Sequence, residues 1–209
     1  MKKNPIVLLI LVITIMFNTV TVSAAAPFAD VPENHWAADA VAMLKNYGYP
    51  LGYGDNTFRG DRSITRYELA GMMAKLLGQK TGISISGYSN PFSDLPSNHY
   101  FYNSVTTLAA KGIMQGYGDG TFRGDKNITR YEMALLMAKL LASADALGGS
   151  RLSGNPFSDV PSNHWAYDSL IALASMGIVN AYGTARYNGD RYATRYEAAV
   201  MIAKAAAAD

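Results

Sequence analysis

The chain contains no cysteine, and this absence excludes disulfide bonds, thiol nucleophiles, thiolate zinc sites and lipid attachment to cysteine. Charge is also scarce, since 16% of the 209 residues are Asp, Glu, Lys or Arg, against about a quarter in an average soluble protein. So low a charge content argues against a long solvated, disordered tail. Hydrophobic residues make up 49% of the chain, which is enough for a sizeable core and one or two domains.

An excess of one sign of charge is missing as well. The formal charge of +2 arises from 18 Lys and Arg against 16 Asp and Glu, and Lys2 and Lys3 account for all of it. The remaining body is neutral and lacks the basic face that displaces counterions from phosphates. We therefore predict no nucleic-acid partner.

A long hydrophobic run occurs only near the N-terminus, where Lys2 and Lys3 precede apolar residues at 6–17. A short polar stretch and small residues at 23–26 follow it. This order is typical of a secretory signal peptide, which we predict for residues 1–26. The alternative is an uncleaved membrane anchor, but the run is shorter than the roughly 20 residues that span a bilayer. We expect the mature protein to be secreted.

Self-comparison of the chain shows three copies of one unit. Each copy opens with Phe-x-Asp-x-Pro, continues with Asn-His-aromatic and later reaches Thr-Arg-Tyr-Glu. We place the units at residues 27–80, 91–143 and 156–209, joined by Gly- and Ser-rich segments that we interpret as flexible linkers. The distance from the opening Phe to the Arg is the same in all copies, which predicts one shared backbone: Phe28 to Arg66, Phe92 to Arg130 and Phe157 to Arg195.

Each unit predicts two amphipathic helices around a Gly-rich loop. In the first unit, Asn34 is the expected N-cap of the first helix, and Gly48 ends that helix in a left-handed conformation. Residues 52–61 are rich in turn formers and are interpreted as a small hairpin. Thr65 and Glu68 have the spacing of a capping box at the start of the second helix. One unit cannot enclose two apolar faces, whereas six helices from three units can share one core.

The repeats resemble the S-layer homology (SLH) family of bacterial cell-surface modules. The likeness rests on the motifs above, on Gly-Tyr-Gly-Asp-Gly-Thr-Phe at 116–122 and on Ile-Thr-Arg at 128–130, and it covers nearly the whole mature chain. All three copies depart from the family in carrying Tyr, where Ala is usual, after the Arg of Thr-Arg-Tyr-Glu. The resemblance implies an all-α fold: three tandem repeats in a pseudo-threefold, three-pronged spindle around a six-helix bundle, with short hairpin-like loops.

The resemblance also implies a non-catalytic function, which is anchoring at the bacterial cell wall or envelope by binding a glycan in grooves between repeats. The partner would be a cell-wall polysaccharide, often an acidic and ketal-pyruvylated secondary polymer, or a peptidoglycan that sometimes carries a polyamine. No small-molecule substrate, cofactor or metal is expected. The alternative is a self-associating or partner-docking subunit of the cell surface, with a protein partner and no glycan affinity of its own.

By this resemblance Arg66, Arg130 and Arg195 become the arginines of the grooves. Each occupies the first position of a predicted helix, where a positive charge opposes the helix dipole, and an anionic partner would explain its recurrence. The structural alternative is an ion pair with an Asp five residues upstream. In either case we expect the guanidinium to point outward. The three Asp residues of that alternative are Asp61, Asp125 and Asp190.

For a cationic amine, Asp55 and Asp119 would be the better contacts. Tyrosine rings beside a polar groove suit the C–H faces of sugars, although Tyr is also a common half-buried core residue. The candidate tyrosines are Tyr53, Tyr117 and Tyr182 in the Gly-rich loops, and Tyr67 and Tyr131 after the arginines.

The remaining aromatic and imidazole groups are assigned structural roles. Trp36 and Trp165 are assigned to packing, and the one His per repeat is expected to be a hydrogen-bonded group beside a helix start, not part of a metal cage. No Ser–His–Asp order recurs with the repeat, so we predict that the protein is not an enzyme.

Overall fold

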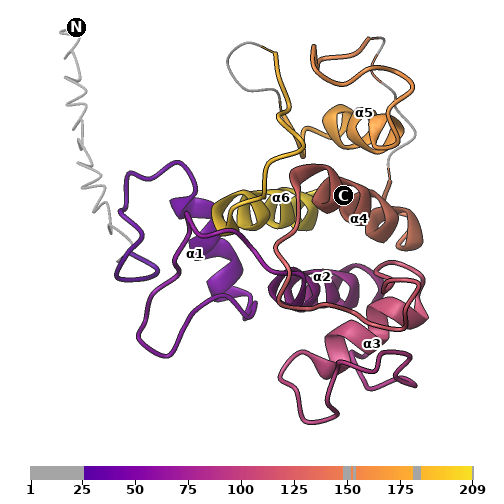
Figure 1. Ribbon diagram of the computed structural model, residues 1–209. Helices are drawn as coiled ribbons and strands as arrows, with labels where there is room; N and C mark the ends of the chain where they lie inside the picture. The colour runs from indigo at the N-terminus through magenta and orange to yellow at the C-terminus, as the bar shows by residue number, and fades with distance from the viewer. Residues whose placement is uncertain (1–25, 148–151, 153, 181–184, 209) are drawn as a thin grey trace, which may run out of the picture.

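The structure is a computed structural model that describes residues 26–147, 152, 154–180 and 185–208. Apart from Ala26, the predicted signal peptide lies outside these residues. None of the described helices is long and apolar enough to cross a membrane. The described residues form six α-helices and no β-strand: α1 (Ala38–Asn46), α2 (Arg66–Thr81), α3 (Tyr102–Ala110), α4 (Arg130–Ser143), α5 (Tyr167–Ser175) and α6 (Arg195–Ala207) (Figure 1).

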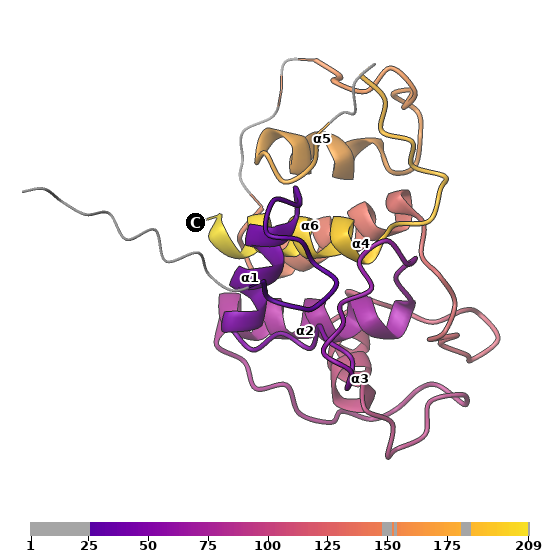
Figure 2. The same cartoon turned by 90° about the vertical axis from the view of Figure 1, so that its left-hand side faces the viewer.

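The second helices of the repeats, α2, α4 and α6, lie at the centre, and the first helices, α1, α3 and α5, lie around them (Figures 1 and 2). The main contacts of the outer helices cross from repeat to repeat: α1 packs on α6, α3 on α2 and α5 on α4. Each repeat therefore completes its core with the preceding repeat, and the contact of α1 with α6 closes the ring. The predicted all-α fold with one shared core is confirmed.

A ring of backbone hydrogen bonds joins the three repeats at the centre. The Ile64 N–H donates to the Ala193 carbonyl at 2.9 Å, the Ala193 N–H to the Ile128 carbonyl at 2.9 Å, and the Ile128 N–H to the Ile64 carbonyl at 3.2 Å. All three side chains are fully buried. The Gly-rich loops contain no β-strand among the described residues, but they close on themselves in hairpin-like turns, in which the Tyr53 N–H donates to the Thr57 carbonyl at 2.9 Å and the Tyr117 N–H to the Thr121 carbonyl at 2.8 Å. The isolated bridges between repeats lie just after these loops, as between Ser63 and Thr194.

The start of each central helix is capped by two repeats at once. In α2, Thr65 and Glu68 form the predicted capping box, and α4 and α6 repeat it. The next repeat accepts two further N–H groups: Arg66 donates to the Lys126 carbonyl at 3.0 Å and Tyr67 to the Gly124 carbonyl at 2.8 Å. The N–H groups that a helix terminus leaves without intrahelical partners are thus satisfied across the repeat boundary.

The outer helices begin later than predicted. Asn34 is not the N-cap of α1, because the helix starts after Ala37 and the Ala37 N–H donates to Nδ1 of His35 at 3.3 Å. His99 and His164 accept equivalent bonds from Phe101 and Ala166. The structural role predicted for the three His is therefore confirmed. The left-handed end at Gly48 is also confirmed, with φ of 70°.

The first linker is not a flexible tether. Ile83 and Ile85 pack against the hydrophobic core. The Thr107 hydroxyl of α3 donates to the Ser86 carbonyl at 2.9 Å. The segment between the first two repeats is thus bound to the surface of the bundle.

The interface of α2 with the second repeat differs in side-chain volume from its two equivalents. A Cβ on Gly71 would overlap the Phe101 ring. The positions that correspond to Gly71 carry Leu135 and Val200, and those that correspond to Phe101 carry the small residues Ala166 and Ala37, as the repeat spacing shows. At each of the three interfaces, one of these two positions therefore carries a large side chain and the other a small one.

We therefore expect Gly71→Leu and Phe101→Ala to destabilise the fold by about 2 kcal/mol each, the first by overpacking and the second by leaving a cavity. The double variant restores a large–small pair, and we expect it to recover at least about 1 kcal/mol of the summed loss. Urea unfolding of the four proteins measures this coupling. Strict additivity would show that the two positions do not compensate each other.

Candidate inter-repeat grooves

Two surface clefts between repeats are lined by residues at equivalent positions of the repeats. Each cleft contains one glutamate, and we number the groove after the repeat that supplies this glutamate. Groove 1 has a cavity of about 330 Å³, and groove 3 has a cavity of about 320 Å³. Groove 1 is lined by Tyr53 and Glu68 of the first repeat, Tyr100 and Phe101 of the second, and Arg195 of the third.

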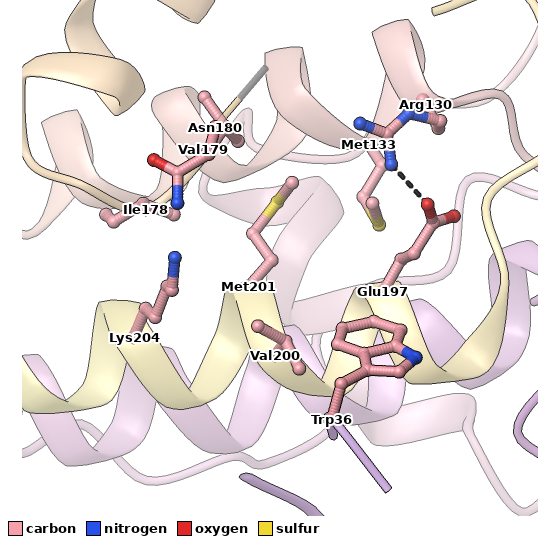
Figure 3. Close-up of a pocket in the computed structure, with 10 residues that line it drawn as sticks. All are labelled: Trp36, Arg130, Met133, Ile178, Val179, Asn180, Glu197, Val200, Met201 and Lys204. Atoms are coloured by element: carbon pink, nitrogen blue, oxygen red, sulfur yellow. Dashed lines mark hydrogen bonds and ion pairs between the residues drawn. The ribbon is translucent and has the colours of Figure 1, made fainter. Parts of the chain in front are cut away.

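Groove 3 is the equivalent cleft one repeat earlier along the ring. Its wall consists of the α6 residues Glu197, Met201 and Lys204, with Arg130 of α4 facing Glu197 and Trp36 of the first repeat lying beside Glu197 (Figure 3). The repeat spacing assigns the corresponding residues of groove 2 as Glu132, Trp165 and Arg66. Each groove therefore combines a glutamate of one repeat, an aromatic residue of the next and an arginine of the preceding one.

The aromatic residue of each groove is exposed. Trp36, Tyr100 and Trp165 are 62%, 79% and 57% exposed. Trp36 and Trp165, predicted to have packing roles, each lie against one tyrosine ring, Tyr196 and Tyr131, with ring centroids 6.1 and 5.8 Å apart, but they leave more than half of their surface to solvent. A signal for this was present, since the aromatic residue after the His recurs in all three repeats but precedes the apolar stripe of the outer helix.

The three arginines do not point outward as predicted, since Arg66, Arg130 and Arg195 are only 7%, 4% and 3% exposed. Each Nε donates to a loop carbonyl of the next repeat, at 3.0, 3.0 and 2.8 Å. The acceptors are Phe122, Tyr187 and Phe58. The alternative pairing with Asp61, Asp125 or Asp190 is also wrong, because the carboxylates that pair with Arg130 and Arg195 belong to Glu197 and Glu68.

In groove 1, Glu68 is the centre of a network. Nη1 of Arg195 lies 2.9 Å from its Oε1, the Tyr53 hydroxyl donates to the same oxygen at 2.6 Å, and Arg62 also pairs with it. Burial alone would raise the pKa of Glu68, but the Thr65 N–H, the Tyr53 hydroxyl and the two guanidiniums outweigh it and lower the pKa below its ordinary value. Burial lowers the pKa of Arg195.

Groove 3 has the same kind of network around a glutamate that is less exposed to solvent. Arg130 pairs with Glu197, and Nη1 of Arg191 donates to the other carboxylate oxygen of Glu197 at 2.9 Å. Glu197 is 7% exposed. In both grooves two guanidiniums surround one carboxylate, so the charge of the cluster is positive.

Groove 2 lacks this ion pair. Within the described residues, neither Arg66 nor Glu132 takes part in a salt bridge, although Glu132 still accepts from the Thr129 N–H at 2.8 Å. Lys126 corresponds to Arg62 and Arg191, but its Nζ donates to the Tyr117 hydroxyl at 3.2 Å. The groove that has a lysine at this position, whose ammonium group lacks the planar fork of a guanidinium, is thus the groove in which the arginine and the glutamate do not form an ion pair.

The candidate tyrosines divide into two groups. Tyr53 and Tyr117 are half-buried beside the groove arginines, with guanidinium carbons 5.0 and 5.2 Å from their ring centroids. Tyr182 lies outside the described residues. Tyr67 and Tyr131 are buried instead, on His99 and His164 of the next repeat, with ring centroids 4.1 and 4.2 Å apart. These two tyrosines pack repeats together, and their faces are covered, contrary to the predicted contact with sugars.

The Asp55 and Asp119 side chains are exposed, but their carboxylates are hydrogen-bonded to residues of their own loops. The Thr57 hydroxyl and Arg59 hydrogen-bond Asp55 and lower its pKa to about 2, and equivalent bonds lower the pKa of Asp119 to about 2. Neither residue lines a groove cavity. The turn that each carboxylate closes explains its recurrence in the first two repeats.

Comparison with known proteins agrees with this architecture. The S-layer homology domain matches residues 27–70, 91–134 and 156–199. The chain is 34% identical over 75% of its length to "Cell surface glycoprotein 1" and 35% identical over 73% to "Cellulosome-anchoring protein", both from Acetivibrio thermocellus, and 29% identical over 90% to "Amylopullulanase" from Thermoanaerobacterium thermosulfurigenes. The matched parts span only 7%, 33% and 10% of those proteins. Three matched repeats and this identity show that the chain belongs to the S-layer homology domain family.

Proposed function

We propose that this chain is a non-catalytic anchoring module that holds to the bacterial cell wall by binding a wall glycan in its inter-repeat grooves. The observation that carries the proposal is the exposed aromatic ring beside a buried arginine–glutamate pair, as in groove 3 with Trp36, Arg130 and Glu197 (Figure 3). The proposal also draws support from the relative named as a cellulosome-anchoring protein.

This combination of groups suits a sugar. A pyranose ring presents C–H groups on its face, which pack on an aromatic ring, and hydroxyls on its edge, which need donors and acceptors. In groove 3, Trp36 supplies the apolar face, while the side chains of Arg130, Glu197 and Asn180 supply polar edges. Met133 and Met201 complete an adaptable apolar wall.

The charge balance of the grooves favours a neutral or acidic glycan over one that carries a polyamine. In grooves 1 and 3, Glu68 and Glu197 each have two guanidinium partners, so neither of these two carboxylates is left to receive an ammonium group. Asp55 and Asp119, the contacts considered for an amine, are paired with Arg59 and Arg123 outside the cavities.

Exposed aromatic residues provide the cleanest test, because an arginine variant would also disturb folding. We expect Trp36→Ala and Trp165→Ala each to lower the affinity for purified wall sacculi about threefold to tenfold, through loss of an aromatic contact. Sedimentation of the purified protein with sacculi measures retention. Tyr47→Ala is the matched control, since Tyr47 is exposed at the end of α1 and lines neither groove cavity.

Unchanged retention in the Trp36→Ala, Trp165→Ala double variant, with an intact helical signal, would contradict glycan binding in the grooves. The alternative function, a self-associating or partner-docking surface subunit, predicts a different result. In that case the protein would form oligomers that depend on its concentration, and it would not be retained by sacculi.

A further inference from the structure

The Arg195 side chain in groove 1 has its hydrogen-bonding edges occupied by the protein itself. Nε donates to the Phe58 carbonyl at 2.8 Å, Nη2 donates to the Leu51 carbonyl, and Nη1 faces the Glu68 carboxylate at 2.9 Å. The two carbonyls hold the guanidinium in place. Among these three partners, only Glu68 is a carboxylate, and it lies on the wall of the cavity.

Groove 3 has the same internal pair, whereas groove 2 does not. Arg130 pairs with Glu197. In groove 2, Arg66 keeps the two carbonyl contacts, to Phe122 at 3.0 Å and to Gln115 at 2.8 Å, without any salt bridge in the described chain. The two kinds of groove therefore differ in whether a carboxylate pairs with the arginine and in the second cation, which is Arg62 or Arg191 in grooves 1 and 3 and Lys126 in groove 2.

We propose that Glu68 and Glu197 are internal competitors of acidic groups on the wall polymer and thereby set the charge preference of grooves 1 and 3. A ligand carboxylate that approaches Arg195 must take the place of Glu68, and this exchange subtracts the internal ion pair from the binding free energy. A neutral sugar instead bonds to the pair as it stands. This inference rests on the proposed glycan binding.

The test separates the charge of Glu68 from its role in the capping box. Gln also completes a capping box, so Glu68→Gln keeps the start of α2 and removes the competing charge. Asp39→Asn is the control, because it also removes one negative charge from the first turn of a helix, α1, where Asp39 is exposed and lines neither groove cavity. Retention is measured on native sacculi and on sacculi whose carboxylates have been converted to amides with a carbodiimide.

We expect Glu68→Gln to raise the affinity for native sacculi about fivefold, the size of one partly exposed ion pair, and to leave the affinity for amidated sacculi unchanged. Asp39→Asn should change neither affinity. If Glu68→Gln unfolds in a thermal melt, Glu197→Gln in groove 3 makes the same test and carries the same expectation.

Lower affinity of Glu68→Gln for both kinds of sacculi would overturn the inference, since it would show that Glu68 accepts a bond from the sugar. An equal gain in Glu68→Gln and Asp39→Asn would also overturn it, because a general change in charge would then explain the result. Failure of the wild-type chain to bind either kind of sacculi would contradict the proposed function itself.

Discussion

Replacing Arg195 with methionine is expected to lower the free energy of unfolding by about 3–5 kcal/mol, the cost of breaking a buried ion pair from one side. Methionine fills much of the same volume, so the effect is electrostatic and not a cavity. The Phe58 and Leu51 carbonyls lose their donor, and the more exposed Arg62 is the cationic partner that Glu68 keeps. Because Arg195 links the third repeat to the first, the variant weakens the closure of the ring.

Urea unfolding followed by far-ultraviolet circular dichroism measures this loss. The matched control is Arg59→Met, which breaks the pair with Asp55, whose two side chains are 48% and 52% exposed. An exposed pair of this kind contributes at most about 1 kcal/mol. Equal stabilities of the two variants would show that the burial of Arg195 contributes nothing to closure.

Replacing Gly124 with alanine is expected to lower the free energy of unfolding by about 3 kcal/mol through overpacking between repeats. The Tyr67 ring lies directly on Gly124, and a Cβ there would overlap three of its ring carbons. The ring cannot move away easily, because His99 stacks on it at 4.1 Å and the Tyr67 N–H donates to the Gly124 carbonyl at 2.8 Å. The methyl group therefore forces the first and second repeats apart.

Gly118→Ala in the same loop is the control, since a Cβ at Gly118 meets nothing within 4 Å. Thermal melts of the two variants should differ by several degrees, with Gly118→Ala near the wild type. Similar melting temperatures would mean that the contact of Tyr67 with Gly124 relaxes without cost.

Gly124 is the central residue of an Arg-Gly-Asp segment at 123–125, which corresponds to Arg-Gly-Asp at 59–61 and Asn-Gly-Asp at 188–190. Gly60 and Gly189 correspond to Gly124, and a Cβ on them would overlap Tyr196 and Tyr131. The abundance of turn formers in these loops does not explain why this position is glycine in all three copies. The reason is a tyrosine of the preceding repeat, or of the third repeat in the case of Gly60.

The arginines show most clearly where local reasoning is insufficient. A cation at the first position of α2 opposes the helix dipole, which suggests an external anion. In the structure, carbonyls at Phe122 and Gln115 of the next repeat receive the Arg66 guanidinium. These acceptors are loop backbone atoms, which have no signature in the sequence, so neither the depth of the arginine nor its partners could be deduced.

The sequence by itself determined the number of repeats, the capping boxes at Thr65, Thr129 and Thr194, the left-handed helix end at Gly48 and the need for one shared core. These features depend on contacts within a few residues or on simple periodicity. Only the tertiary structure decided that each outer helix packs on the preceding repeat and that the arginines are buried while Trp36 and Trp165 are exposed. The physical reason is that identical units can pair with themselves or with their neighbours, and only the three-dimensional closure of the ring selects between the two.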